Sequence, residues 1–208
     1  MEEEMDKKRI IFATGNAGKM KEVKMILADL NMPVLSMKEA GMEVDVEENG
    51  TTFEENAVIK ARAIQKMVPG DIVLADDSGL EIDYLNKEPG IYSARYMGED
   101  TSYDIKNAKI LERMENVEDE KRTARFVCAI AAAMPGGEVL TTYATMEGKI
   151  AYQIAGENGF GYDPIFCVPE YGCTFGELAS DVKNSISHRA RAFTALGSAL
   201  KQYAEEGE

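Results

Sequence analysis

Two long strand-like runs joined by a short turn constrain the fold of this chain more than any other feature. Residues 122–134, RTARFVCAIAAAM, and residues 138–150, EVLTTYATMEGKI, lie on either side of the turn Pro135-Gly136-Gly137. Runs of this kind around a glycine turn predict a long antiparallel β-hairpin. Because amphipathic helical patterns precede and follow the hairpin, we expect an α/β protein with a mixed sheet.

The remainder of the chain alternates between short apolar runs and patterns with helical spacing. Apolar runs at residues 9–14 and 71–77 predict buried strands, and the second run leads into a predicted acidic turn at Asp76-Asp77. Residues 32–37 predict a further short strand. Helices are predicted at residues 16–30, 52–68, 102–114 and 187–203.

Two of these helices carry more detailed predictions. Thr52 and Glu55 have the spacing of a capping box, and Pro69-Gly70 ends the helix that they begin. The helix at residues 102–114 is expected to bury one apolar face, formed by Ile105, Ala108, Leu111 and Met114.

Length and charge limit the classes of partner. The 208 residues fit a single domain, 1–208, with two lobes and with acidic ends, residues 1–8 and 205–208, that we expect to be flexible. A formal net charge of −14 makes nucleic acid an unfavourable partner. No apolar run approaches the roughly 18 residues of a membrane span, so we expect no membrane partner.

The cysteines and the N-terminus indicate a compartment. Cys128, Cys167 and Cys173 are scattered and form no CxxC pair, which argues against a zinc site and against a disulfide framework. The first residues are acidic and lack the apolar core of a signal peptide. We therefore expect a reduced, cytoplasmic protein.

The segment Phe12–Glu22, FATGNAGKMKE, joins a predicted strand to a predicted helix. It is not a Walker loop, because Ala13 replaces the first glycine and Met20 replaces the Ser or Thr. A strand–loop–helix junction still offers unpaired N–H groups to an anion at the helix start. Lys19 lies in the first turn, where the helix dipole disfavours a cation unless an anion lies beside it. A plain turn with a solvated lysine has equal weight.

Two groups of acids are candidate ligands for a hard cation. Asp76, Asp77 and the following Ser78 come directly after an apolar run, and side chains at the carboxyl end of a buried strand commonly face a ligand. Residues 43–48 contribute four further acids. Oxygen ligands of this kind suit Mg²⁺. A solvated acidic surface is the alternative, and it suits Glu43 and Asp45 best.

Two later segments are candidates for recognising a base. Residues 156–164, GENGFGYDP, have their glycines in the reverse order of a dinucleotide fingerprint, so a Rossmann site is rejected. Phe160 and Tyr162 can stack on a base, or they can fill the core. Ser187 is a good N-cap that places His188 and Arg189 in the first helical turn. A lone histidine is more often structural than catalytic, and no triad is supported.

Six segments in order resemble the inosine triphosphate pyrophosphatase family, over a span from about Arg9 to Leu200. They are ATGNAGKMKE, EENGTTFEENAVIKA, ADDSGLEID, PGIYSARY, GFGYDPIF and SISHRARA. The resemblance implies an elongated mixed sheet with two α/β lobes around a central cleft, and a homodimer. It also implies hydrolysis of ITP, dITP and XTP to the monophosphate and pyrophosphate, with Mg²⁺ as cofactor.

The resemblance also implies roles for particular residues. Asp77 would be the general base that activates water, and Glu47 and Asp77 would bind Mg²⁺. Lys60 and Lys183 would neutralise phosphate charge, and Ser78 would contact substrate. The triphosphate would be bound by Thr14, Gly15, Asn16, Ala17, Gly18 and Lys19. The base pocket would be formed by Phe160, Gly161, Tyr162, Asp163, His188 and Arg189.

Elementary chemistry agrees with this assignment. Attack on a polyphosphate needs charge neutralisation and alignment, which lysines and a metal ion supply. A donor such as Arg189, directed at a 6-keto oxygen, would disfavour the 6-amino group of adenine. The rejection of GTP has no explanation in the sequence. Two alternatives stay open: a pyrophosphatase for modified or pyrimidine nucleotides, and a nucleotide sensor without hydrolytic activity.

Overall fold

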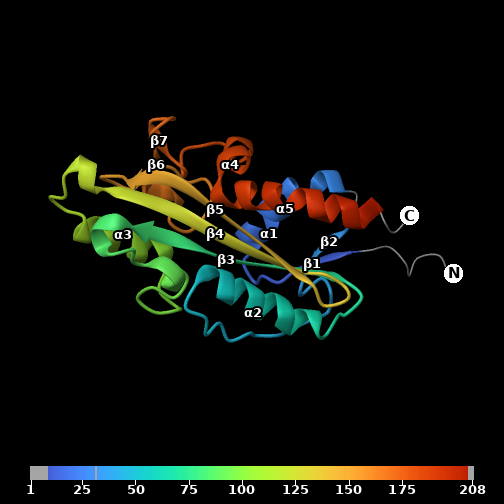
Figure 1. Cartoon of the computed structure of the whole chain (residues 1–208). Helices are drawn as coiled ribbons and strands as arrows, with labels where there is room; N and C mark the ends of the chain where they lie inside the picture. The colour runs from blue at the N-terminus through green and yellow to red at the C-terminus, as the bar shows by residue number, and fades with distance from the viewer. Residues whose placement is uncertain (1–8, 31, 206–208) are drawn as a thin grey trace. The chain divides into compact units, whose positions relative to one another are not determined.

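The structure is a computed structural model that describes residues 9–30 and 32–205 (Figure 1). The ends predicted to be flexible lie outside the described residues, apart from Glu205, the last residue of a helix. The strands are β1 (Ile10–Phe12), β2 (Val34–Ser36), β3 (Ile72–Ile82), β4 (Thr123–Ala133), β5 (Val139–Ile150), β6 (Phe166–Val168) and β7 (Cys173–Thr174). The α-helices are α1 (Ala17–Ile26), α2 (Phe53–Gln65), α3 (Tyr103–Arg113), α4 (Ser180–Ile186) and α5 (His188–Glu205).

The strands form one seven-stranded sheet in the order β2-β1-β3-β4-β5-β6-β7. Strand β1 lies between β2 and β3 and runs parallel to both, whereas β6 is antiparallel to β5 and to β7. The predicted hairpin forms β4 and β5, and its turn is closed by a hydrogen bond of 2.8 Å from the Met134 N–H to the Glu138 carbonyl. The prediction of an α/β fold with a mixed sheet is confirmed.

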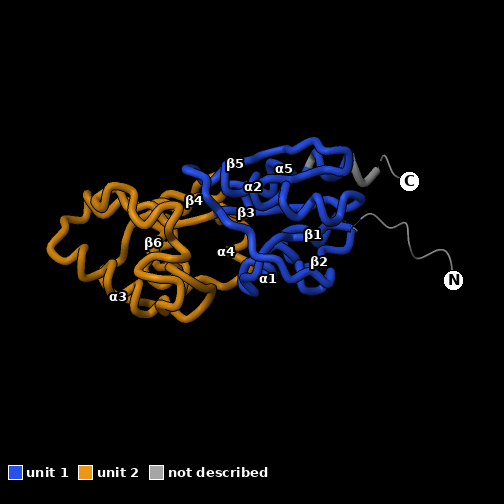
Figure 2. Tube along the Cα trace, turned by 90° about the horizontal axis from the view of Figure 1, so that it is seen from below, with its two compact units in different colours: residues 1–77, 129–143, 190–208 blue, residues 78–128, 144–189 orange. Residues whose placement is uncertain are grey.

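The chain divides into two compact units (Figure 2). Unit 1 contains residues 1–77, 129–143 and 190–208, and unit 2 contains residues 78–128 and 144–189. The boundary falls within β3, between Asp77 and Ser78. The predicted cleft between two lobes stays a prediction.

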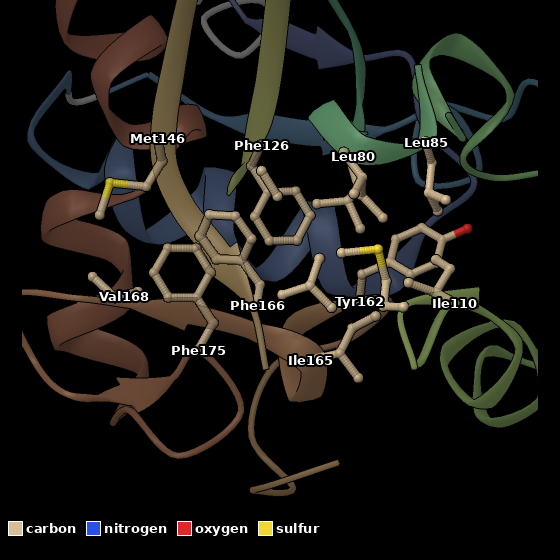
Figure 3. Packing of buried hydrophobic residues seen from close by; sticks show 14 of the residues in the cluster. Leu80, Leu85, Ile110, Phe126, Met146, Tyr162, Ile165, Phe166, Val168 and Phe175 are labelled. Atoms are coloured by element: carbon tan, nitrogen blue, oxygen red, sulfur yellow. The ribbon is translucent and has the colours of Figure 1, made fainter. Parts of the chain in front are cut away.

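Each unit has apolar packing of its own. In unit 1, the rings of Phe12 and Phe193 meet edge to face with centroids 6.2 Å apart. In unit 2, the rings of Phe126, Phe166 and Phe175 pack together among aliphatic side chains (Figure 3). Burial of this apolar surface is the main force that stabilises both units.

The prediction of an acidic turn at Asp76-Asp77 is wrong, because β3 continues to Ile82. Within β3, only residues 72–74 pair with the three-residue strand β1, so Asp76 and Asp77 lie just beyond the end of β1. Side chains from α1 and α2 bond to the two carboxyl groups, as described below. This bonding allows two acids to lie inside a buried strand.

The predicted apolar face of α3 is confirmed for Met114, which is buried, and for Leu111, which packs partly buried against the apolar cluster of unit 2, but it is wrong for Ile105 and Ala108. Ile105 is exposed, as is Ala108, whereas Lys106, Asn107 and Ile110 are buried. The two polar side chains are tolerated inside the protein because they donate hydrogen bonds to backbone carbonyls of neighbouring loops.

Helix starts agree with the sequence in part. The Thr52 hydroxyl caps α2 by accepting the Glu55 N–H at 3.1 Å, and the Glu55 carboxylate accepts hydrogen bonds of 2.7 Å and 2.8 Å from the N–H and the hydroxyl of Thr51. The helix predicted to begin at residue 187 is α5. Ser187 lies in extended backbone between α4 and α5, and α4 was not predicted from the sequence. Within the described residues, no helix combines the length and the apolar character that crossing a membrane requires.

Candidate active site

The loop between β1 and α1 has the geometry of an anion site. Asn16 is the N-cap of α1 and accepts the Lys19 N–H at 3.1 Å, and the Thr14 hydroxyl accepts the Asn16 N–H at 3.1 Å. Among the residues that the structure describes, no acceptor lies on the N–H groups of Ala17 and Gly18. These groups at the positive end of a helix are available to a phosphate.

A cavity of about 840 Å³ borders this loop within unit 1. Thr14, Gly15 and Asn16 line one end of it, and the rest is lined by α1 and by residues near the end of β2. A methyl group added at Gly15 would meet no atom within 4 Å, so the loop backbone borders open space at this point. The loop therefore has room for a ligand without rearrangement.

Two buried acids lie beside the loop on β3. Asp76 is 1% exposed and Asp77 is 8% exposed. The Lys19 ammonium lies 3.1 Å from Oδ1 and 3.0 Å from Oδ2 of Asp76. The Asn56 amide of α2 donates a hydrogen bond of 2.9 Å to Oδ2 of Asp77. The two neighbouring carboxyl groups therefore differ, since Asp76 is neutralised by a lysine and Asp77 has a neutral partner.

The environment of Asp77 shifts its titration toward neutral pH. The pKa of Asp77 is raised to about 6, mainly by burial and to a smaller extent by the negative charge of Glu48. The hydrogen bond from Asn56 and the charges of Lys19 and Lys60 oppose this shift. A carboxyl group with a pKa near the working pH is suited to take a proton from water.

A second lysine approaches the same strand from α2. Lys60 forms an ion pair with Glu48, and its ammonium lies 3.5 Å from the backbone carbonyl of Asp76. Lys19 and Lys60 thus bring two positive charges to the acid pair. Charges placed in this way can neutralise phosphate oxygens.

The acids of residues 43–48 divide into two groups. Glu43, Asp45 and Glu47 are exposed, whereas Glu48 is half-buried and its charge reaches Asp77. Within the described residues, no three His, Cys, Asp or Glu side chains form a metal-binding group. The Asp77 and Glu48 carboxylates are donors of the kind that suits Mg²⁺, which is commonly held by one or two carboxylates and waters, and a bound cation would also relieve the repulsion between their charges.

The glycine loop in unit 2 has a shape that only glycine allows. Gly159 and Gly161 have φ angles of +76° and +68°. The Asp163 carboxylate accepts the Phe160 N–H at 2.7 Å and the Lys183 ammonium at 2.6 Å. A Cβ at Gly159 would lie 2.1 Å from the same carboxylate oxygen. The loop is thus wrapped closely around Asp163.

Four of the predicted site residues meet around this loop. The Lys183 ammonium and the Arg189 guanidinium lie 4.9 Å and 5.8 Å from the centroid of the half-buried Phe160 ring. Arg189 also donates a hydrogen bond of 3.0 Å to the Ser78 hydroxyl. The structure therefore joins Ser78, from the acidic segment, to the residues predicted to bind the base.

Two other predicted base-pocket residues are buried. The Tyr162 side chain lies in the apolar cluster of unit 2, and the His188 ring stacks on Phe126 with centroids 4.8 Å apart. Lys183 is bonded to Asp163, and its predicted role in neutralising phosphate stays a prediction. The sequence analysis missed Asn56, although its position four residues before Lys60 puts both on one helix face.

A helix start with unpaired N–H groups beside a buried pair of acids is the arrangement expected of a protein that acts on a phosphorylated ligand. The profile of the Ham1 family matches residues 10–199. This chain belongs to the Ham1 family. This match, together with dITP/XTP pyrophosphatases among the relatives, confirms the resemblance seen in the six sequence segments.

Relatives and solved structures agree over nearly the whole chain. The dITP/XTP pyrophosphatase of Clostridium perfringens is 51% identical over 199 residues, which cover 93% of this chain and 98% of the relative. That of Bacillus subtilis is 49% identical over 194 residues, with 93% and 98% covered. The Ham1 protein of Staphylococcus aureus has a TM-score of 0.82 at 43% identity, and 94% of this chain and 100% of that one are covered.

Proposed function

We propose that this protein hydrolyses non-standard purine nucleoside triphosphates, namely ITP, dITP and XTP, to the monophosphate and pyrophosphate. The relatives named dITP/XTP pyrophosphatases support the reaction and its substrates. The observation that carries the proposal is the convergence of Lys19 and Lys60 on Asp76, directly beside Asp77. Cations at that position balance the charge of a triphosphate next to a candidate base.

The loop Thr14–Lys19 binds the triphosphate in this proposal. Its free N–H groups at the start of α1 donate hydrogen bonds to phosphate oxygens, and the Lys19 ammonium exchanges part of its contact with Asp76 for a phosphate. Lys60 adds a second positive charge from α2. Asp77 takes a proton from the attacking water, a role that its raised pKa supports.

Mg²⁺ fits the same group of carboxylates. Asp77, with Glu47 or its half-buried neighbour Glu48, would bind it. When bound, the ion supplies positive charge to the phosphate oxygens and lowers the pKa of a coordinated water.

Base recognition is assigned to unit 2. The Phe160 ring offers an apolar face, and the buried Arg189 offers N–H donors that suit the 6-keto oxygen of hypoxanthine or xanthine. The 6-amino group of adenine would place its own N–H donors against those of Arg189, so this hydrogen bond could not form. Gly161, Asp163 and Lys183 support the ring through the shape of the loop.

The proposal extends to the setting of the reaction. We propose a homodimer in the cytoplasm, with small-molecule nucleotides as its ligands. Cys128, Cys167 and Cys173, all within the described residues, form no disulfide, which suits a reducing compartment.

The experiment that tests the function is a phosphate-release assay on ITP, XTP, ATP and GTP with Mg²⁺, with and without added inorganic pyrophosphatase. Signal from ITP and XTP only in the presence of the added enzyme supports cleavage between the α- and β-phosphates. Equal signal without it contradicts the proposed bond, since terminal phosphate is then released. Calorimetric binding of ITP without any product indicates a sensor, and pyrophosphate release from CTP or UTP in the same coupled assay indicates a different specificity.

A further inference from the structure

Residues 89–96, PGIYSARY, take no part in the site described above, although they lie between two of its segments in the chain. Ser93 within them is buried, with 4% of its surface exposed. Its hydroxyl accepts the Leu80 N–H at 2.9 Å and donates to the Gly90 carbonyl at 2.7 Å. Leu80 lies on β3, two residues after Ser78. Ser93 therefore attaches this loop to the part of β3 that carries a site residue.

The same residue is bonded to the glycine loop. The Tyr162 hydroxyl donates a hydrogen bond of 2.7 Å to the Ser93 carbonyl. The Tyr162 ring is 3% exposed and meets the Tyr103 ring edge to face at 5.2 Å. Figure 3 shows Tyr162 in the apolar cluster, with its hydroxyl directed away from the rings of Phe126 and Phe166. The Tyr162 side chain is thus engaged inside the protein.

Helix α3 contacts both loops through its buried polar face. The Lys106 ammonium donates to the Ala94 carbonyl at 2.6 Å, and the Asn107 amide donates to the Gly161 carbonyl at 3.1 Å. Both side chains are almost fully buried. The helix therefore supports the loop of residues 89–96 and the loop of residues 159–163 at once.

We propose that Ser93 and Tyr162 are positioning residues for base recognition, an inference that rests on the proposed function. Their bond, here called the 93–162 brace, sets the glycine loop with Phe160 at a constant position relative to β3. Because Arg189 is bonded to Ser78 on that strand, the 93–162 brace keeps the Phe160 ring and the Arg189 donor at constant positions relative to each other. Tyr162 acts through the loop and does not touch the base.

Tyr162→Phe tests the brace, because it removes the hydroxyl and keeps the ring. Tyr103→Phe is the matched control: within the described chain the Tyr103 hydroxyl makes no hydrogen bond, and its ring packs against the same neighbour. Both variants are compared with the unchanged protein by steady-state kinetics on XTP with Mg²⁺. Amide hydrogen exchange of the nucleotide-free proteins is followed in parallel.

Leaving the buried Ser93 carbonyl without a donor should raise KM for XTP about tenfold in Tyr162→Phe, with kcat changed by less than about threefold. Exchange of the amides of residues 159–163 should be faster in this variant alone. Tyr103→Phe should match the unchanged protein in both measurements. A tyrosine that only stabilises the core would lower the melting temperature and leave KM unchanged.

The proposed role of the 93–162 brace is contradicted if amide hydrogen exchange of residues 159–163 is equal in all three proteins, or if KM for XTP does not rise in Tyr162→Phe. Failure of the proposed function gives a different result, since the unchanged protein would then not turn over XTP at all. In that case the exchange measurement alone decides whether the brace exists.

Discussion

The Asn56 amide of α2 donates a hydrogen bond of 2.9 Å to the Asp77 carboxylate of β3, and this neutral partner distinguishes Asp77 from the lysine-bound Asp76. An asparagine in place of Asp77 can still accept this bond through its own carbonyl. Asp77→Asn should therefore fold normally and lose about 10²- to 10⁴-fold in kcat, as expected for a lost general base. Coupled pyrophosphate release from XTP measures the loss, and wild-type turnover would exclude the assigned role.

The same substitution should change how stability depends on pH. The folded-state pKa of Asp77 is raised from its ordinary 3.8 to about 6, so the protein loses stability as pH rises through that value and a buried carboxylate forms. Asp77→Asn removes this loss. We expect it to gain roughly 3 kcal/mol in unfolding free energy at pH 8 and nothing below about pH 4.

Urea unfolding at the two pH values, in EDTA to remove divalent ions, measures the gain. Asp45→Asn is the matched control, because Asp45 is an exposed acid from the other acidic segment. Equal effects of the two substitutions at pH 8 would contradict a special environment at Asp77.

Lys19 is expected to stabilise the folded protein and to take part in the reaction, and these two effects can be measured separately. Lys19→Ala leaves the buried Asp76 carboxylate without its ammonium, so it should destabilise the protein by about 3 kcal/mol and lower kcat/KM for XTP by about 10²-fold. Lys201→Ala removes an exposed lysine from another helix of unit 1, α5, and should change neither.

The double variant Lys19→Ala/Asp76→Ala separates the two actions. It removes both charges, so it should recover much of the stability and none of the activity. Recovered activity in the double variant would mean that Lys19 serves only to neutralise Asp76.

The parts of the site that were predictable share one property: local sequence alone identifies them. Lys19 follows a strand–loop–helix junction, and Asp76 follows an apolar run, so each could be assigned from its neighbours. Ser93 and Asn107 could not, because their roles depend on partners far away in the chain, the Tyr162 hydroxyl for Ser93 and the Gly161 carbonyl for Asn107. Helical spacing alone favoured burial of Ile105 on α3. Lys106 and Asn107 are buried instead, with their long-range hydrogen bonds.

The glycine loop supplies the last prediction, which concerns Gly159. An alanine here would have to adopt a φ of +76° and place its methyl group 2.1 Å from the Asp163 oxygen that binds Phe160 and Lys183. Gly159→Ala should therefore displace the loop and raise KM for XTP at least tenfold. Gly172→Ala is the control, because its φ is +64° but no atom lies within 4 Å of the added methyl group.

The control should lose only the roughly 1–2 kcal/mol expected for alanine in the left-handed region, with KM unchanged. Urea unfolding and XTP kinetics on the two variants distinguish strain from displacement. If both variants lose the same stability and neither changes KM, the contact between Gly159 and Asp163 has no part in recognising the base.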